Sequence, residues 1–206
     1  FFRQRDAASY VLGRALVRKL CADWFAIPPS AVEFEVTAVG RPFLRPSGAV
    51  QEPAFDFNLS HSGGCIVVAW SPRQRVGVDT ERVATPAHRD FGHLAERLFA
   101  PDQQRLLASV SAGDRPSTFY RIWVRKEAVL KAEGCGLSGI ASISTVSARD
   151  GRYDWAGQVA CGNAASTWSV TELPVPPGYV AAVAKRPGVA HAQYAAWKGV
   201  TAEGPT

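Results

Sequence analysis

The segment from Ser117 to Glu133 limits the fold most, because its apolar residues recur with the period of a helix. Four large apolar side chains share one stripe along it: Phe119, Ile122, Trp123 and Leu130. Gly134 and Gly136 follow at once, and glycine favours the left-handed conformation that ends a helix. The sequence therefore predicts a helix here with one face in the protein core.

The same helix carries an unusual polar cluster. Residues 123–131 read W-V-R-K-E-A-V-L-K, so Trp123, Glu127 and Lys131 lie four residues apart on one face, and Lys126 precedes the acid. A carboxylate between ammonium groups on an otherwise apolar face indicates a site that handles metal and phosphate. The alternative is an exposed helix with an ion pair between Glu127 and Lys131, which contributes only about 0.3 to 0.5 kcal/mol.

Composition excludes several classes of protein. The 206-residue chain is 47% apolar and 20% charged, which suits a globular fold. No apolar run approaches the roughly 20 residues that cross a bilayer, so a cytoplasmic protein without membrane contact is expected. The four cysteines form no C-x-x-C pair, which argues against a zinc site. A net charge of +5 favours an acidic partner, but the basic residues are scattered, which disfavours nucleic acid.

Periodicity and turn residues predict the other elements. A first amphipathic helix runs from Asp6 to Trp24, with Asp6 as its N-cap. The predicted strands are 32–39, 55–60, 65–70, 76–83, 140–146, 168–173 and 179–184. Further helices are predicted over 89–99 and from Pro101 onward, and the tail after Pro187 is expected to fray.

Helix and strands come in similar order twice along the chain. The sequence therefore predicts an α/β (α+β) fold of two similar lobes, residues 1–76 and 77–206, with a ligand site between them. The chain contains no Met, so a further piece of the N-terminal lobe is expected to precede it.

Two acidic residues alternate in the predicted strand G-V-D-T-E at 77–81. A strand period of two puts Asp79 and Glu81 on one side while Val76 and Val78 face the other. Two carboxylates on one face suit a hard cation such as Mg²⁺, and Glu127 would be a third ligand. The alternative is a solvated strand end in which Asp79 caps the next turn.

Two loop-edge segments offer donors for phosphate. In F-N-L-S-H-S-G-G at 57–64, the hydroxyl of Ser60, the ring of His61 and nearby backbone groups can bind phosphate oxygens. In Gly40-Arg41-Pro42, the bend would hold Arg41 where it can grip a phosphate. Taken alone, the first segment is a simple turn and the second a solvated arginine.

Together, F-N-L-S-H-S, G-V-D-T-E and W-V-R-K-E-A-V-L-K, in this order and spacing, resemble the 4′-phosphopantetheinyl transferases of the Sfp type. The resemblance implies two lobes related by a pseudo-twofold axis, with coenzyme A and Mg²⁺, or Mn²⁺ in its place, in the cleft. The implied metal ligands are Asp79, Glu81 and Glu127. The implied coenzyme A contacts are Gly40, Arg41, Asn58, Ser60, His61 and Lys131.

The resemblance implies a holo-[acyl-carrier-protein] synthase type of enzyme, which moves the phosphopantetheine arm of coenzyme A onto a carrier-protein serine and releases adenosine 3′,5′-bisphosphate. Phosphoryl-transfer logic then assigns Glu127 to take the serine proton, either directly or through a metal-bound water, and Lys131 to stabilise the departing phosphate, with Lys126 as a helper. The metal would neutralise charge on the diphosphate.

The partner implied by the resemblance is an acyl or peptidyl carrier protein, as in polyketide or nonribosomal peptide biosynthesis. Its acidic helix after the modified serine would suit a basic, monomeric enzyme. Two other functions stay open: a Mg²⁺-dependent nuclease or phosphohydrolase, and a non-catalytic basic module that binds nucleic acid. The second of these would bind with a steep salt dependence.

Overall fold

The fold is given by a computed structural model, which describes residues 4–38, 40–45, 55–72, 74–84, 90–137, 139–149, 152–161, 166–188 and 193–198. Its helices are α1 (Gln4–Phe25), η1 (Pro29–Ala31), α2 (Phe91–Leu98), α3 (Pro101–Ser109), α4 (Arg115–Glu133) and η2 (Ile140–Ser142), of which η1 and η2 are 3-10 helices. Its strands are β1 (Phe34–Val36), β2 (Pro42–Leu44), β3 (Asp56–Ser62), β4 (Cys65–Ser71), β5 (Val76–Arg82), β6 (Val146–Arg149), β7 (Arg152–Trp155), β8 (Gln158–Cys161), β9 (Ser166–Glu172), β10 (Tyr179–Lys185) and β11 (Gln193–Lys198).

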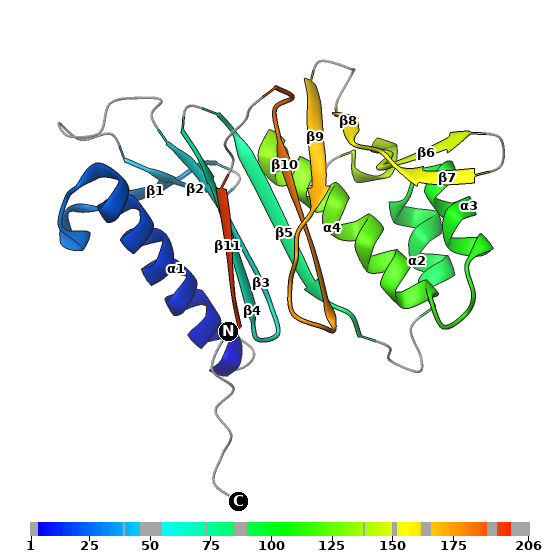
Figure 1. The fold of residues 1–206 in the computed structure, drawn as a ribbon, viewed down its shortest axis with the longest axis horizontal. Helices are drawn as coiled ribbons and strands as arrows, with labels where there is room; N and C mark the ends of the chain where they lie inside the picture. The colour runs from blue at the N-terminus through cyan, green and yellow to red at the C-terminus, as the bar shows by residue number, and fades with distance from the viewer. Residues whose placement is uncertain are drawn as a thin grey trace, which may run out of the picture.

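Two larger sheets, each with antiparallel neighbours, form the body of the molecule (Figure 1). One has the strand order β11, β4, β3, and the other has the order β5, β10, β9, β8. Helix α1 packs on β3 and β4, whereas α4 packs on β5 and β10 and also contacts α2 and α3. The predicted mixed α and β fold is confirmed, while the pseudo-twofold relation and the boundary at residue 76 stay predictions.

Helix α4 forms where the sequence predicts it and begins two residues earlier. Pro116 lies in its first turn, where the missing N–H of proline costs no hydrogen bond. Gly134 ends it with a left-handed φ of 80°, and its N–H donates to the carbonyl of Leu130. The helix therefore presents 123–131 as a continuous helical surface.

The two sheets meet where β3 runs beside β5, and side chains bridge them. The N–H groups of β5 donate to side chains of β3 at 2.8 Å from Val76 to Asp56, 2.9 Å from Val78 to Asn58, 3.2 Å from Thr80 to Ser60 and 3.1 Å from Arg82 to Ser62. Each step joins residues 20 apart in the sequence, so the two strands run parallel. We call this set of contacts the β3–β5 ladder.

Gly77 allows α4 to approach β5 closely. A Cβ atom at this position would lie 2.1 Å from the carbonyl oxygen of Ala128 and 2.4 Å from the nitrogen of Ala132. Both atoms belong to the helix backbone and cannot rotate away. The glycine therefore sets the distance at which side chains of β5 meet those of α4.

Several local predictions are wrong. Helix α1 begins at Gln4 and contains Asp6, so Asp6 is not its N-cap. A turn in which the N–H of Gly40 donates to the carbonyl of Thr37 shortens the predicted strand over 32–39 to β1. The predicted strand over 140–146 begins instead as η2, because Gly139 turns the chain with a φ of 77°.

The expectation of a fraying tail is wrong for residues 193–198, because β11 pairs along β4 from Cys65 to Trp70, while residues 199–206 lie outside the described residues. Strand β4 is a nearly continuous buried run, and its second edge needs hydrogen-bond partners that β11 provides. The chain thus returns from the second sheet to the first. Among the described residues, no helix combines the length and the apolar character that a membrane span requires.

Candidate active site

Strand β5 directs two carboxylates toward helix α4. Since Gly77 contacts the α4 backbone, the alternation of a strand puts Asp79 and Glu81 on that same face. Val76 and Val78 are fully buried in a cluster on the opposite face. The structure has the alternation that the sequence predicts.

Asp79 is joined to α4 by a largely buried ion pair. The Asp79 side chain is 6% exposed, and its Oδ1 lies 2.6 Å from Nζ of Lys131. Ser60 Oγ donates to the same carboxylate oxygen at 2.8 Å. The Lys131 ammonium also donates to Ser60 Oγ at 3.1 Å. Three residues from β3, β5 and α4 therefore form one polar unit at the junction of the two sheets.

Glu127 lies one helical turn before Lys131 and faces both acids of β5. Burial, and after it the negative charges of Asp79 and Glu81, raise the pKa of Glu127 to about 7, while the positive charge of Lys131 opposes the shift. These charges act on Glu127 only because the groups are close to it. The structure thus gathers the three acids that the sequence predicts as metal ligands.

Asp79, Glu81 and Glu127 offer carboxylate oxygens, the ligands that a hard cation prefers. In the part of the chain that the structure describes, no group of three or more His, Cys, Asp or Glu side chains is placed so that it could hold a metal ion. Two buried carboxylate oxygens of the described residues nevertheless lack a hydrogen-bond partner, Asp79 Oδ2 and Glu127 Oε1. A buried anionic oxygen without a partner is costly, and Mg²⁺ prefers such ligands. The two unpartnered oxygens therefore have the chemistry of hard-cation ligands, although the three acids are not arranged as a metal site in this structure.

A pocket of about 280 Å³ opens beside this cluster. Its wall comes from the end of α4 and the glycines after it, from the bend before β2, and from β3. The lining residues are Gly40, Arg41, Pro42, Asn58, Leu59, Glu127, Leu130, Lys131, Gly134, Gly136 and Leu137. Five residues predicted from the sequence, which are far apart in the chain, therefore line one pocket: Gly40, Arg41, Asn58, Glu127 and Lys131.

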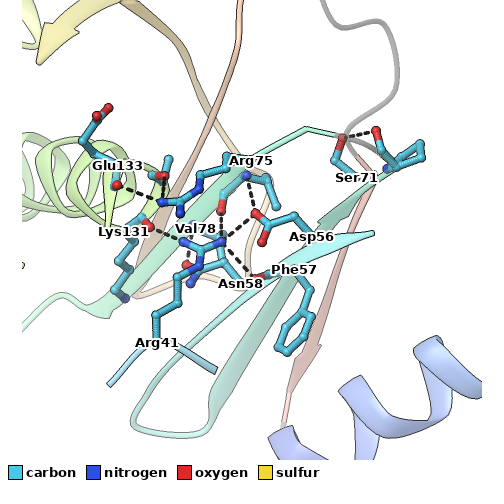
Figure 2. A network of polar contacts seen from close by, with 12 residues as sticks. Arg41, Asp56, Phe57, Asn58, Ser71, Arg75, Val78, Lys131 and Glu133 are labelled. Atoms are coloured by element: carbon cyan, nitrogen blue, oxygen red, sulfur yellow. Dashed lines mark hydrogen bonds and ion pairs between the residues drawn. The ribbon is translucent and has the colours of Figure 1, made fainter. Parts of the chain in front are cut away.

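Arg41 lines the pocket, but its guanidinium is bound to the protein itself (Figure 2). Nη2 donates to Asp56 Oδ2 at 2.6 Å and to the carbonyl oxygens of Val76 at 2.9 Å and Phe57 at 3.2 Å. Nη1 donates to the carbonyl of Lys131. In this structure Arg41 joins β3, β5 and the end of α4, and its predicted contact with coenzyme A stays a prediction.

Two other predicted coenzyme A contacts lie outside the pocket wall. Ser60 is 7% exposed and is held between Thr80, Asp79 and Lys131. His61 is half-buried on β3, and the alternation of the strand turns it away from the face that carries Ser60 and Ser62. The contacts of both residues with coenzyme A stay predictions.

The structure does not bring Lys126 to the pocket. Its side chain is fully buried, and Nζ donates to Gln103 Oε1 at 2.7 Å and to the carbonyl of Ile143 at 2.6 Å. Burial lowers the pKa of Lys126 to about 7. The ammonium therefore ties α4 to α3 and to the loop after η2, and a helper role at the phosphate has no support from this position.

Sequence reasoning missed two residues of the site, Asp56 and Ser62. Both accept from β5 in the β3–β5 ladder, and Ser62 Oγ also donates to Glu81 Oε2 at 2.6 Å. The available signal was the period of two in which Asp56, Asn58, Ser60 and Ser62 alternate with other residues. A strand with one polar face predicts that this face meets partners other than solvent.

Comparison with known proteins identifies the family. The profile described as "4'-phosphopantetheinyl transferase superfamily" matches residues 75–184, and the profile "4'-phosphopantetheinyl transferase, N-terminal" matches residues 1–73. The chain belongs to the 4′-phosphopantetheinyl transferase superfamily. The resemblance found in the motifs is thereby confirmed.

Individual relatives of this superfamily agree with the match. An L-aminoadipate-semialdehyde dehydrogenase-phosphopantetheinyl transferase of Xenopus laevis is 36% identical over 141 residues, which are 66% of this chain and 47% of the relative. The 4'-phosphopantetheinyl transferase psf-1 of Bacillus pumilus is 34% identical over 71% of this chain and 59% of its own. HetI of Nostoc is 29% identical over 89% of this chain and 73% of its own. The chain spans about half the length of the Xenopus relative.

Proposed function

We propose that this chain transfers the 4′-phosphopantetheine arm of coenzyme A to a serine of an acyl or peptidyl carrier protein, as a holo-[acyl-carrier-protein] synthase does. Membership of the superfamily supports the reaction. The observation that carries the proposal is the pocket that has Glu127 and Lys131 on its wall, with Asp79 bound to Lys131 behind it. A carboxylate, a positively charged side chain and an open pocket are the elements that phosphoryl transfer requires of the protein.

The reaction forms a bond between the serine oxygen and the β-phosphorus of coenzyme A. The bond from that phosphorus to the bridging oxygen breaks, and adenosine 3′,5′-bisphosphate leaves with the electron pair. The serine hydroxyl must lose its proton, and Glu127 accepts it. A carboxylate whose pKa is about 7 is well matched to accept a proton at neutral pH.

Lys131 provides positive charge where negative charge develops on the phosphate oxygens. Its side chain is 29% exposed and lines the pocket, so the ammonium can reach a bound phosphate. The contact with Asp79 holds it in place before the substrate binds. Positioning of this kind lowers the reorganisation needed during the reaction.

Mg²⁺, or Mn²⁺ in its place, would be held by Asp79, Glu81 and Glu127, and when bound it neutralises charge on the diphosphate. The unpartnered oxygens of Asp79 and Glu127 support this assignment. Glu127 has two carboxylate oxygens, so one can face a cation while the other faces the serine hydroxyl.

Charge supports a carrier protein as the partner. The chain has a net charge of +5, and an acidic helix after the modified serine would be attracted to it. Such attraction mainly raises the rate of encounter and the specificity. A monomeric state and a cytoplasmic location remain predictions.

The test is to incubate the chain with an apo carrier protein, coenzyme A and Mg²⁺, and to measure the intact mass of the carrier. We expect a gain of one phosphopantetheine arm, equal formation of adenosine 3′,5′-bisphosphate, and loss of both when a chelator is added. An unchanged mass with both acyl and peptidyl carriers would contradict the proposal. Cleavage of added nucleic acid in place of transfer would instead favour the nuclease alternative.

A further inference from the structure

Two serines of β3 make the same pair of contacts at successive steps of the β3–β5 ladder. Ser60 Oγ accepts from the N–H of Thr80 at 3.2 Å and donates to Asp79 Oδ1 at 2.8 Å. Ser62 Oγ accepts from the N–H of Arg82 at 3.1 Å and donates to Glu81 Oε2 at 2.6 Å. In each case the serine binds the carboxylate of one residue and the backbone N–H of the next. We call this repeated unit the serine clasp.

The clasp fixes the direction of each carboxylate. A serine hydroxyl has one hydrogen to donate, and here the carboxylate receives it. The backbone N–H that the same oxygen accepts is held by β5, so this contact keeps the serine oxygen in place beside the carboxylate. Hydrogen bonds to an ionised carboxylate are about twice as strong as those between neutral groups. The clasp thus orients an acid relative to the strand that carries it.

The other ladder steps show that the clasp is specific to the acids. Asp56 and Asn58 accept from the N–H groups of Val76 and Val78, and the residues before these two donors are Arg75 and Gly77, neither of which is an acid. The serines occur only at the two steps where β5 carries an acid next to the donating N–H. The choice of side chain along β3 therefore follows the positions of the acids along β5.

We propose that Ser60 and Ser62 are positioning residues that hold Asp79 and Glu81 in the orientation for binding a divalent cation. This inference rests on the proposed function, because it concerns the same acids. Ser62 is the residue to test, because Ser60 also accepts from Lys131, so a change at Ser60 would disturb the Asp79–Lys131 ion pair as well. Residues that orient metal ligands typically change metal affinity by 10 to 100-fold when removed.

The experiment measures binding of Mn²⁺ by the full chain, from the electron paramagnetic resonance signal of the free ion, in parallel with transfer to a carrier protein. The variants are Ser62→Ala, Ser62→Thr and Ser71→Ala. Threonine keeps the hydroxyl and suits a strand. Ser71 is a matched control, because it is fully buried at the end of β4 and its hydroxyl donates to the carbonyl of Pro72 at 3.4 Å.

We expect Ser62→Ala to weaken Mn²⁺ binding about 10-fold, while the chain remains folded in the absence of metal. Ser62→Thr should restore most of the affinity, and Ser71→Ala should bind Mn²⁺ as the wild type does. If the wild type binds Mn²⁺ and Ser62→Ala binds it equally well, the clasp has no positioning role and the inference is overturned. If the wild type transfers the arm but neither binds nor requires a divalent cation, the proposed metal itself is overturned.

Discussion

Helices α1 and α4 each pack on a sheet, yet they differ in how much of their surface is enclosed. The buried residues of α4 occur on every side of the helix and include the charged Arg125 and Lys126. Helix α1 buries Val17 but leaves Val11 65% exposed. One helix is surrounded by protein, whereas the other covers a sheet with one face.

Because α4 is enclosed, a polar atom on this helix that lacks a hydrogen-bond partner can indicate a binding site. Inside an enclosed helix, charged side chains need partners, and Lys126 and Glu133 have them in Gln103 and Trp168. Arg125 lacks a partner at Nε but donates to the carbonyl of Ala156 through Nη2. Glu127 is the acid of α4 that keeps a buried oxygen without a partner among the described residues. It is also the acid that lines the pocket.

The largest expected effect in this comparison comes from adding a methyl group at the point where β5 contacts α4. Gly77→Ala would place a Cβ 2.1 Å from a carbonyl oxygen of α4, and we expect the free energy of unfolding to fall by about 3 kcal/mol. Urea denaturation measures it. Gly157→Ala is the control, since its Cβ would meet nothing within 4 Å. Equal stability of the two variants would show that α4 does not rest on β5 as described.

A smaller effect comes from shortening one valine on each helix and comparing the loss of stability. Val129 on α4 is fully buried, whereas Val11 on α1 is 65% exposed. We expect Val129→Ala to lower the free energy of unfolding by about 2 kcal/mol, and Val11→Ala to change it by less than about 0.5 kcal/mol. The same denaturation experiment compares them. A larger loss from Val11→Ala would mean that α1 is enclosed as α4 is.

The smallest effect depends on pH. Because the pKa of Glu127 is about 7 in the folded chain, against 4.5 for an ordinary glutamate, the folded state holds this proton more tightly than the unfolded state. Protonation of Glu127 therefore stabilises the folded chain fully below about pH 4.5, and this stabilisation is lost as the pH rises through 7. Without metal, Glu127→Gln should match the wild type at about pH 4 and melt at least about 3 °C higher at pH 8. A difference that does not change with pH would contradict the raised pKa.

The core of the site was predictable because strong periodic signals carry it. The helix with Glu127 and Lys131 and the strand with Asp79 and Glu81 each follow from local patterns. The packing of one against the other follows from Gly77, whose meaning depends on a helix far away in the chain. Local propensity contains no information about such a distant partner, so only the structure reveals the contact between Gly77 and α4.

The contacts that local patterns could not predict depend on long-range partners. Arg41 resembles a solvent-facing phosphate ligand in sequence, yet its acceptors come from β3, β5 and α4. Lys126 lies next to Glu127 in the chain, but adjacent helix residues point about 100° apart, so it enters the core instead of the pocket. Strand β11 was missed because its pairing with β4 spans most of the sequence.

The central claim is that the pocket-facing acid of α4 performs the chemistry, and Glu127→Gln tests it most directly. The measurement is the rate of arm transfer to a carrier protein, together with the affinity for coenzyme A. Glu133→Gln is the control, because Glu133 lies on the same helix with its carboxylate bound to Ser166 and Trp168. We predict that Glu127→Gln lowers the rate at least about 100-fold while still binding coenzyme A, and that Glu133→Gln keeps a near-normal rate. Transfer by Glu127→Gln at the rate of Glu133→Gln would contradict the account.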